Sequence, residues 1–266
     1  MFQSTYAKNT ADTDRGPSPK IWGDCPIGAM LENPNLGIFF RDDFLTCPKT
    51  PPTTEGNFGI YKAFTDTGGT IADGAEFGGS WVLGSDGDNE GASIHTGATA
   101  FKISTANGKF WFEARVKSST IADTKHGFFV GLMDSTALTA IVPITAAGAI
   151  ADVNIVGFHR LEGDGDMLDT IYKADGVTQV TVKADEVTLV ADTYKKVGMV
   201  YDPGTNLLTF YDDGVPSTTT YTMVAAAGTD FPNDLTLGLV FAVLNATGST
   251  PGTAEMDWWQ CAQLAV

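Results

Sequence analysis

The stretch YKKVGMVYDPGTNLLTFYDDGV, residues 194–215, carries the clearest secondary-structure signal of the chain. Two runs rich in apolar and aromatic residues, 194–201 and 207–211, are separated by the polar piece Asp-Pro-Gly-Thr and followed by Asp-Asp-Gly. Both polar pieces indicate turns, because proline fixes φ near the value that the second turn position needs and glycine tolerates positive φ. The stretch therefore predicts a β-hairpin whose second strand ends in another tight turn.

Similar short runs, punctuated by glycine and proline, continue outward from this hairpin. We expect some twelve to fourteen strands from residue 38 onward, and one or no short helix, at 134–140. Phe112, Ala114 and Val116 should face inward, because they alternate with charged residues that face outward. The expected strands are 38–44, 58–64, 80–83, 92–95, 100–104, 109–117, 127–133, 154–160, 169–173, 178–183, 194–201, 207–211, 235–243 and 255–264. This pattern predicts an all-β antiparallel sandwich.

Composition and charge restrict the partners of the chain. Its 266 residues hold 16 Lys and Arg against 32 Asp and Glu, a formal net charge of −16. A chain this acidic is repelled by nucleic-acid phosphates and by anionic lipid heads. No apolar run is long enough to cross a bilayer, and the first twenty residues lack the apolar core of a secretion signal. We therefore expect no nucleic-acid partner, no membrane span and no secretion signal.

Residues 1–37 differ from the rest of the chain. They hold four prolines and no strand or helix periodicity, which predicts an extended arm ahead of a sandwich at 38–266. The arm nevertheless carries five large apolar side chains that gain by burial, so we expect it to dock onto its own domain or onto a neighbour. For an assembling protein we take these as anchors for a partner: Ile21, Trp22, Ile27, Met30 and Leu31.

The hairpin at 194–215 resembles the paired strands of laminin-G and concanavalin A-like lectin/glucanase sandwiches. The closing stretch AEMDWWQCAQL, 254–264, resembles the last strand of those folds, and FRDDF, 40–44, fits their first strand. The resemblance covers about 38–266 and implies a jelly-roll sandwich. The shorter pieces HGFFVGL at 126–132, NIVGFHR at 154–160 and DFPND at 230–234 resemble bacteriophage virion proteins.

Glycosidases of this superfamily carry alternating carboxylates, Glu-x-Asp-x-Glu, on one face of a strand. Alternation matters because residues i and i+2 of a strand point into the same cleft, where one carboxyl acts as acid and the other as nucleophile. The comparable positions here are Glu113, Arg115 and Lys117, one acid followed by two cations. No serine–histidine–aspartate order or phosphate loop is visible either. The sequence therefore predicts no catalytic pair.

Other candidate sites are few. Asp86, Asp88 and Glu90 resemble the first half of a calcium loop, but glycine stands where the bidentate glutamate belongs. A second acidic cluster lies at 162–169, and solvated turns are the alternative for both clusters. Apart from calcium in such a turn, we expect no cofactor. His95, His126 and His159 lie far apart in the sequence and are expected to fill ordinary strand or loop positions.

Aromatic residues and cysteines complete the candidates. Trp258 and Trp259 either stack on a sugar or fill the core, and as neighbours in a strand they should face opposite ways. The three cysteines are expected to be reduced thiols, with a Cys25–Cys47 disulfide as the alternative.

Together these features favour a non-enzymatic structural protein of a bacteriophage virion. We expect a decoration or cement subunit on the capsid exterior, assembled in the host cytoplasm. Its partners would be the major capsid protein and neighbouring copies of itself, as a dimer or trimer. The alternative is a virion-surface carbohydrate-binding adhesin of the lectin type, and a glycoside hydrolase comes third. The fold alone does not separate these functions.

Overall fold

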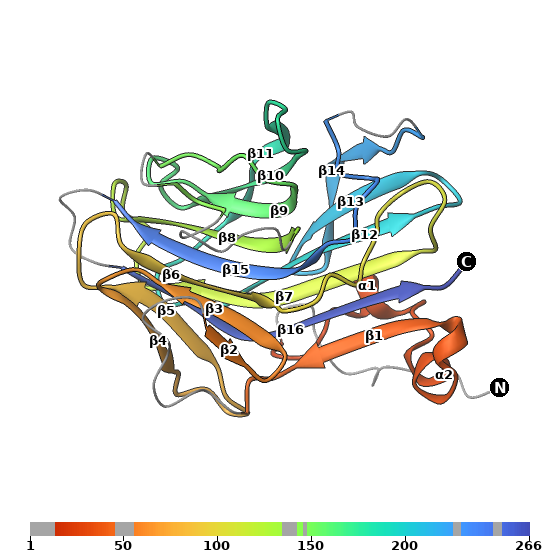
Figure 1. Cartoon of the computed structure of the whole chain (residues 1–266), viewed down its shortest axis with the longest axis horizontal. Helices are drawn as coiled ribbons and strands as arrows, with labels where there is room; N and C mark the ends of the chain where they lie inside the picture. Colours follow the sequence, from red (N-terminus) through yellow and green to blue (C-terminus); the bar gives the residue numbers. More distant parts are fainter. Residues whose placement is uncertain (1–13, 46–55, 135–142, 146–147, 226–229, 247–251) are drawn as a thin grey trace.

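Two antiparallel sheets pack face to face in the computed structural model (Figure 1), which describes residues 14–45, 56–134, 143–145, 148–225, 230–246 and 252–266. Sheet A has the order β14 (Val215–Thr222), β13 (Leu207–Asp212), β12 (Lys195–Asp202), β7 (Phe110–Ser118), β16 (Thr253–Leu264), β5 (Trp81–Ser85) and β4 (Gly69–Asp73). A further strand, β1 (Gly37–Asp42), pairs with the second half of β16, while β5 pairs with its first half.

Sheet B forms the second layer. Its order is β11 (Val180–Thr188), β10 (Met167–Lys173), β9 (Ile155–Arg160), β8 (His126–Met133), β15 (Gly238–Asn245), β6 (Gly91–Thr96), β3 (Tyr61–Thr65) and β2 (Gly56–Phe58). The hairpin of residues 194–215 forms β12 and β13, paired from Val197–Asp212 to Asp202–Leu207. The predicted all-β sandwich is therefore confirmed.

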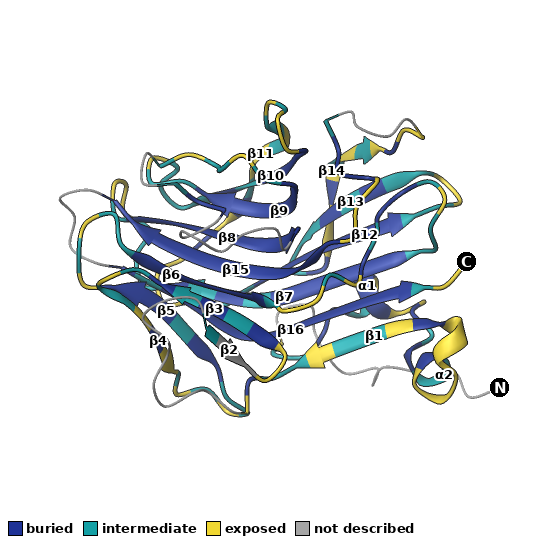
Figure 2. Ribbon diagram, in the orientation of Figure 1, coloured by how far each residue is buried: buried dark blue, intermediate teal, exposed yellow. Residues whose placement is uncertain are grey.

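The core lies between the sheets and follows strand alternation. Phe112, Ala114 and Val116 of β7 are fully buried in it, as predicted. The central strands β8 and β15 are buried along their whole length, because both of their faces are covered (Figure 2). Among the core aromatics, Phe44 stacks on Trp81 with ring centroids 4.7 Å apart.

The structure also corrects several expected elements. Three strands, β2, β4 and β14, were not predicted, and the single strand expected at 58–64 is a hairpin of β2 and β3. Strand β14 is a largely exposed edge strand without apolar alternation. Residues 100–104 form only a single bridge, from Phe101 to Leu237, rather than a strand. Nearly all of the helix expected at 134–140 lies outside the described residues. No described helix is long and apolar enough to cross a membrane.

The described part of the N-terminal segment, residues 14–36, is folded onto sheet A. It forms α1 (Pro19–Trp22), α2 (Ile27–Glu32) and the 3-10 turn η1 (Pro34–Leu36). Trp111, Val200 and Ala262 on the outer face of sheet A receive its apolar side chains. Four of the five expected anchors are buried in this contact: Ile21, Trp22, Ile27 and Met30. The expectation that they are available to a neighbour is corrected, because the chain's own sandwich already covers them.

The outer face of sheet B is also covered by the chain itself. Ile144, together with the partly buried Ile150 and Val153, packs on an apolar patch of that face that includes Phe129 and Val240. At the end of this covering segment, Asn154 Nδ2 donates a hydrogen bond to Asp134 Oδ2 at 2.6 Å. Both broad faces of the sandwich are therefore covered in part by connecting segments.

The turn between β13 and β14 provides a direct test of the hairpin. Asp213 and Gly214 have φ values of 45° and 76°, in the left-handed region that favours glycine. We expect Gly214→Val to lower the free energy of unfolding by about 1–3 kcal/mol. Gly204→Val, in the preceding turn at negative φ, is the matched control and should cost much less. Equal thermal midpoints for the two variants would contradict this account of the turn.

Candidate functional site

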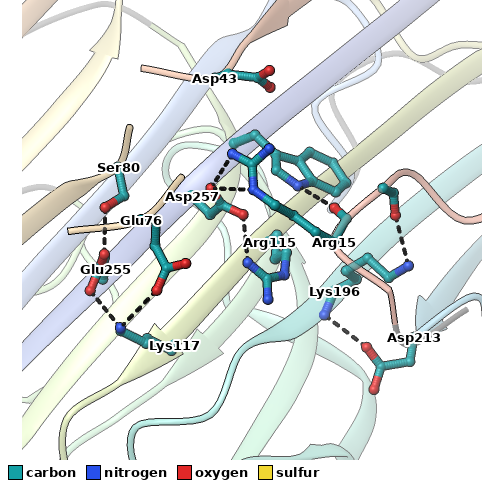
Figure 3. Close-up of polar contacts among 12 residues, drawn as sticks. Arg15, Asp43, Glu76, Ser80, Arg115, Lys117, Lys196, Asp213, Glu255 and Asp257 are labelled. Carbon is teal, nitrogen blue, oxygen red and sulfur yellow. Dashed lines mark hydrogen bonds and ion pairs between the residues drawn. The ribbon is translucent and has the colours of Figure 1, made fainter. Parts of the chain in front are cut away.

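A strip of polar side chains runs along the outer face of sheet A (Figure 3). Strand β7 contributes Glu113, Arg115 and Lys117 to it, because these residues alternate with the core-facing ones. The neighbouring strand β16 contributes Glu255 and Asp257, with an irregularity of register between Met256 and Trp258. The strip is the main concentration of buried charge in the described part of the chain.

Glu113 anchors the N-terminal segment to this strip. Its carboxylate is fully buried and accepts hydrogen bonds from the Ser18 amide at 3.0 Å and from Trp22 Nε1 at 2.7 Å. Burial raises the pKa of Glu113, while the hydrogen bonds from Ser18 and Trp22 and the positive charge of Lys196 counteract part of that rise. The sequence correctly predicts that Glu113 faces outward, but residues 14–36 cover it.

Asp257 forms a second anchor point. Its carboxylate is fully buried, with Arg15 Nη2 at 2.6 Å and Arg115 Nη1 at 2.5 Å. Arg15 also binds through its backbone, since its carbonyl accepts a hydrogen bond from Trp258 Nε1 at 2.7 Å. A buried carboxylate needs such partners, because removal of one of them leaves an uncompensated charge. Arg15 thus couples the N-terminal segment to β16.

Glu255 lies beside Lys117, at the end of the strip opposite to Glu113. It pairs with Lys117 Nζ at 2.8 Å and accepts a hydrogen bond from the Ser80 hydroxyl. Burial raises the pKa of Glu255, but the hydrogen bonds from Lys117 and Ser80 outweigh it and leave the pKa below its ordinary value. Lys117 also contacts Glu76 at 3.6 Å and lies over the Tyr194 ring.

Glu255-Met-Asp257 is an alternating carboxylate pair that was not predicted, since the pair was expected on the strand of Glu113 or at residues 157–162. A count of acidic residues at i and i+2 in the closing strand would have found it. Both carboxylates form ion pairs with cations of this chain. The next polar residue on the same face is Gln260, whose side-chain amide cannot act as a general acid. The strip is thus arranged to hold the chain together, and its acids are not free for acid–base chemistry.

Neither expected sugar-stacking tryptophan is accessible. Trp258 and Trp259 are both fully buried. Trp259 packs in the core beside Phe44, whereas Trp258 lies on the opposite face and bonds to the N-terminal segment. The prediction that they face opposite ways is correct, but neither ring offers a surface for a ligand.

The described contacts bring together only two of the three expected calcium ligands. The carboxylates of Asp86 and Glu90 both lie beside Gly68. A Cβ atom added to Gly68 would be 1.9 Å from Glu90 Oε2 and 2.1 Å from Asp86 Oδ1, so the two oxygens lie close to each other. No described contact brings Asp88 to that spot. Two carboxylates fall short of the six to eight oxygen ligands that calcium takes, so calcium at this loop stays a prediction.

A different group of residues is better arranged for a metal ion. His159 on β9 lies directly opposite Asp169 on β10, and Asp164 in the connecting turn completes the group. One donor atom from each lies within 4.8 Å of the others. His159 is 2% exposed, and its Nδ1 has no hydrogen-bond partner in the structure; Asp164 Oδ2 is the nearest acid, at 3.6 Å. From the sequence, His159 was expected to fill an ordinary strand or loop position.

Surrounding groups orient these donors. The Leu161 amide donates to Asp164 and the Asp185 amide donates to Asp169, at 2.7 and 2.9 Å. Burial raises the pKa of Asp164, but the nearby His159 ring, the hydrogen bond from the Leu161 amide and the positive charge of Arg160 outweigh it and lower the pKa. The Gln179 side-chain amide nitrogen lies 3.1 Å from His159 Nε2 and donates to it, so the proton of the neutral ring sits on Nδ1, on the side of Asp164. A metal ion in this group would displace that proton. One nitrogen and two carboxylates suit manganese or zinc better than calcium.

The comparisons with known proteins establish the fold. The endo-1,3-beta-glucanase from Streptomyces sioyaensis is 14% identical, with a TM-score of 0.58 over 85% of this chain and 96% of that chain. Peanut lectin is 14% identical, with a TM-score of 0.55 over 86% of this chain and 99% of that chain. The CBM2 module of the Lactobacillus casei BL23 phage J-1 evolved Dit is 14% identical, with a TM-score of 0.52 over 87% and 96%.

Identities this low define a fold and no more. The chain has the antiparallel jelly-roll sandwich that concanavalin A-like lectins and glucanases share. No protein-family model and no curated protein matches the sequence.

The contact between Trp22 and Glu113 can be measured by a double-mutant cycle. Trp22→Phe keeps the ring but removes the indole donor, so the buried carboxylate loses a charge-assisted hydrogen bond; we expect a loss of about 1.5–3 kcal/mol. Glu113→Gln in the same background should cost less than in the native chain, with a coupling above about 0.5 kcal/mol in chemical denaturation. Additive losses would show that the two side chains do not interact.

The metal group can be tested by thermal melting. Manganese or zinc at a concentration of 100 times its dissociation constant should stabilise the chain by about 2.7 kcal/mol. Asp164→Asn should remove this stabilisation, whereas Asp166→Asn, in the same turn but outside the group, should preserve it. An unchanged melting temperature with both ions, or equal effects of the two variants, would rule out the assignment.

Proposed function

We propose that this protein is a non-enzymatic structural protein of a bacteriophage virion, bound to the exterior of the capsid. The observation that carries the proposal is that segments of the chain itself cover part of each broad face of its sandwich. A glycosidase of this fold needs an open cleft with two available carboxylates. The carboxylates on sheet A are instead fixed by Arg15, Arg115 and Lys117.

Charge and similarity give further support. A chain with a net charge of −16 is repelled by packaged nucleic acid, which suits a position on the outside of a shell. The sequence pieces that resemble virion proteins, at 126–132 and 154–160, form the buried strands β8 and β9. A module of a phage Dit protein has the same fold. The partner in this proposal is the major capsid protein.

One observation favours a second candidate function, a carbohydrate-binding adhesin of the virion surface. The group of His159, Asp164 and Asp169 could hold a metal ion at a sheet surface, where an ion can orient a sugar hydroxyl. Similar structures include a carbohydrate-recognition domain described as a potassium-bound form. If neither manganese nor zinc raises the melting temperature, this second candidate function loses its support.

Binding to capsids tests the main proposal. The purified protein is mixed with capsids that lack it, from the phage that encodes it, and the mixture is sedimented. We expect saturable co-sedimentation at a fixed ratio to the major capsid protein. Capsids that already carry the protein are the control and should take up none, because their sites are occupied. Absence of binding to the depleted capsids would contradict the proposal.

A further inference from the structure

One end of the sandwich holds a buried histidine between the two sheets. His126, the first residue of β8, is fully buried and points toward sheet A, because it lies on the same face of its strand as the core residues Phe128 and Val130. Its Nε2 lies 3.0 Å from Oγ of Ser118, the last residue of β7. Since β7 belongs to sheet A and β8 to sheet B, this contact joins the two sheets.

The hydroxyl of Ser118 fixes the position of the proton on this ring. It donates to the Thr120 carbonyl at 2.6 Å, so Ser118 Oγ is the acceptor in its contact with His126. The neutral ring therefore carries its proton on Nε2 and a lone pair on Nδ1. Among the described residues Nδ1 has no hydrogen-bond partner, and Gly252 lies directly against it, since a Cβ atom added to Gly252 would be 2.1 Å from Nδ1. A second proton, bound at Nδ1, would be a buried donor facing this backbone.

A buried guanidinium lies near this histidine. Arg160, the last residue of β9, is fully buried and donates to the carbonyls of Thr120 at 3.0 Å, Ala122 at 2.8 Å and Gly165. Burial and the positive charge of Arg160 lower the pKa of His126 to about 3. The site thus favours the neutral ring both by its lack of water and by its charge.

The other charged groups at this end of the sandwich act on Arg160 rather than on the histidine. The titratable side chains of the neighbouring segments are Asp123 and Lys125 before β8 and Glu162, Asp164 and Asp166 after β9. The three aspartates among them act on the Arg160 guanidinium, and Arg160 acts on the ring of His126. From β15 and the segment before β16, the ring faces Asn245 and Gly252, which carry no charge. None of these described groups stabilises a charged ring.

Residues 119–125, which connect β7 to β8, are held in place by these contacts against backbone strain. Thr124 has a φ of 60°, in the left-handed region that β-branched residues avoid. Its amide donates to the Glu162 carbonyl at 2.6 Å, and Arg160 binds two further carbonyls of the connection. Ile121, in the same connection, packs against the core. Such a conformation persists only while its surroundings hold it, so weaker contacts at this end let the connection open.

We propose that this end of the sandwich is an acid-sensitive latch, in which protonation of His126 releases the connection 119–125 from Ser118 and Arg160. In the open state the ring titrates at its ordinary pKa of about 6.5. The open state therefore binds the additional proton, so the closed state is fully favoured above pH 6.5 and is progressively lost as the pH falls from 6.5 toward 3. The latch is a property of the protein alone and does not depend on capsid binding.

Hydrogen exchange of the native protein at pH 7 and pH 5.5 provides the experiment. The reporters are the amides of Thr124 and Ala246, which bond to the carbonyls of Glu162 and Lys125. Their protection factors should be about tenfold lower at pH 5.5 than at pH 7. The Gly97 amide, in a turn at the opposite end of the sheet, should have equal protection factors at the two pH values.

Two variants separate His126 from the other histidines. His126→Gln keeps a donor for Ser118 but takes up no proton, so the difference in protection between the two pH values should vanish. His95→Gln, at another buried histidine, is the matched control and should retain the tenfold difference.

Three results would overturn the proposal. The first is equal protection of the Thr124 and Ala246 amides at the two pH values in the native chain. The second is a tenfold difference that persists in His126→Gln. If that variant does not fold, the ring signals of His126 in the native protein decide by nuclear magnetic resonance. A ring that takes up its proton with a pKa near 6.5, while Thr124 and Ala246 stay protected, is the third contradicting result.

Discussion

The buried carboxylate of Glu113 is the constraint on which the outer half of this structure depends. It lies in the middle of sheet A, where the strand pattern places it, and it accepts hydrogen bonds from Ser18 and Trp22. Without residues 14–36 it would face water together with Trp111 and Ala262. The segment buries apolar side chains on this face and supplies the donors that the covered carboxylate needs, so the sandwich and the N-terminal segment stabilise each other.

This mutual dependence changes the role of residues 1–37. A segment with four prolines and scattered apolar residues suggests an arm for a neighbour, yet its apolar side chains cover the chain's own sheet. Deletion of the segment would expose the apolar surface of Trp111, Val200 and Ala262, so the sandwich is not expected to keep its native stability without it.

Local features of the fold could be predicted from the sequence, and long-range ones could not. The hairpin at 194–215 is specified by its turn residues, and the inward face of β7 by alternation, since both signals lie within a few neighbouring residues. The contact of Arg15 with Asp257 joins residues 242 positions apart, and no local pattern reports it. The exposed strand β14 was missed because it lacks an apolar alternation.

The candidate sites also depend on long-range features that the local sequence does not contain. Burial of Trp258 and Trp259 depends on what covers the sheet, which the strand pattern does not contain. The meeting of His159 with Asp169 depends on the register of β9 and β10, and therefore on the geometry of their turn. Sequence reasoning found the acidic residues of that turn, but it could not place the histidine across from them.

Native-state hydrogen exchange of the Ser18 amide shows whether the N-terminal segment is an integral part of the folded sandwich. This amide donates to the buried Glu113 and lies outside any strand. The account predicts protection comparable to that of the β7 amides, because release of Ser18 requires exposure of the buried carboxylate. Exchange as fast as in an unprotected peptide, with β7 still protected, would contradict it.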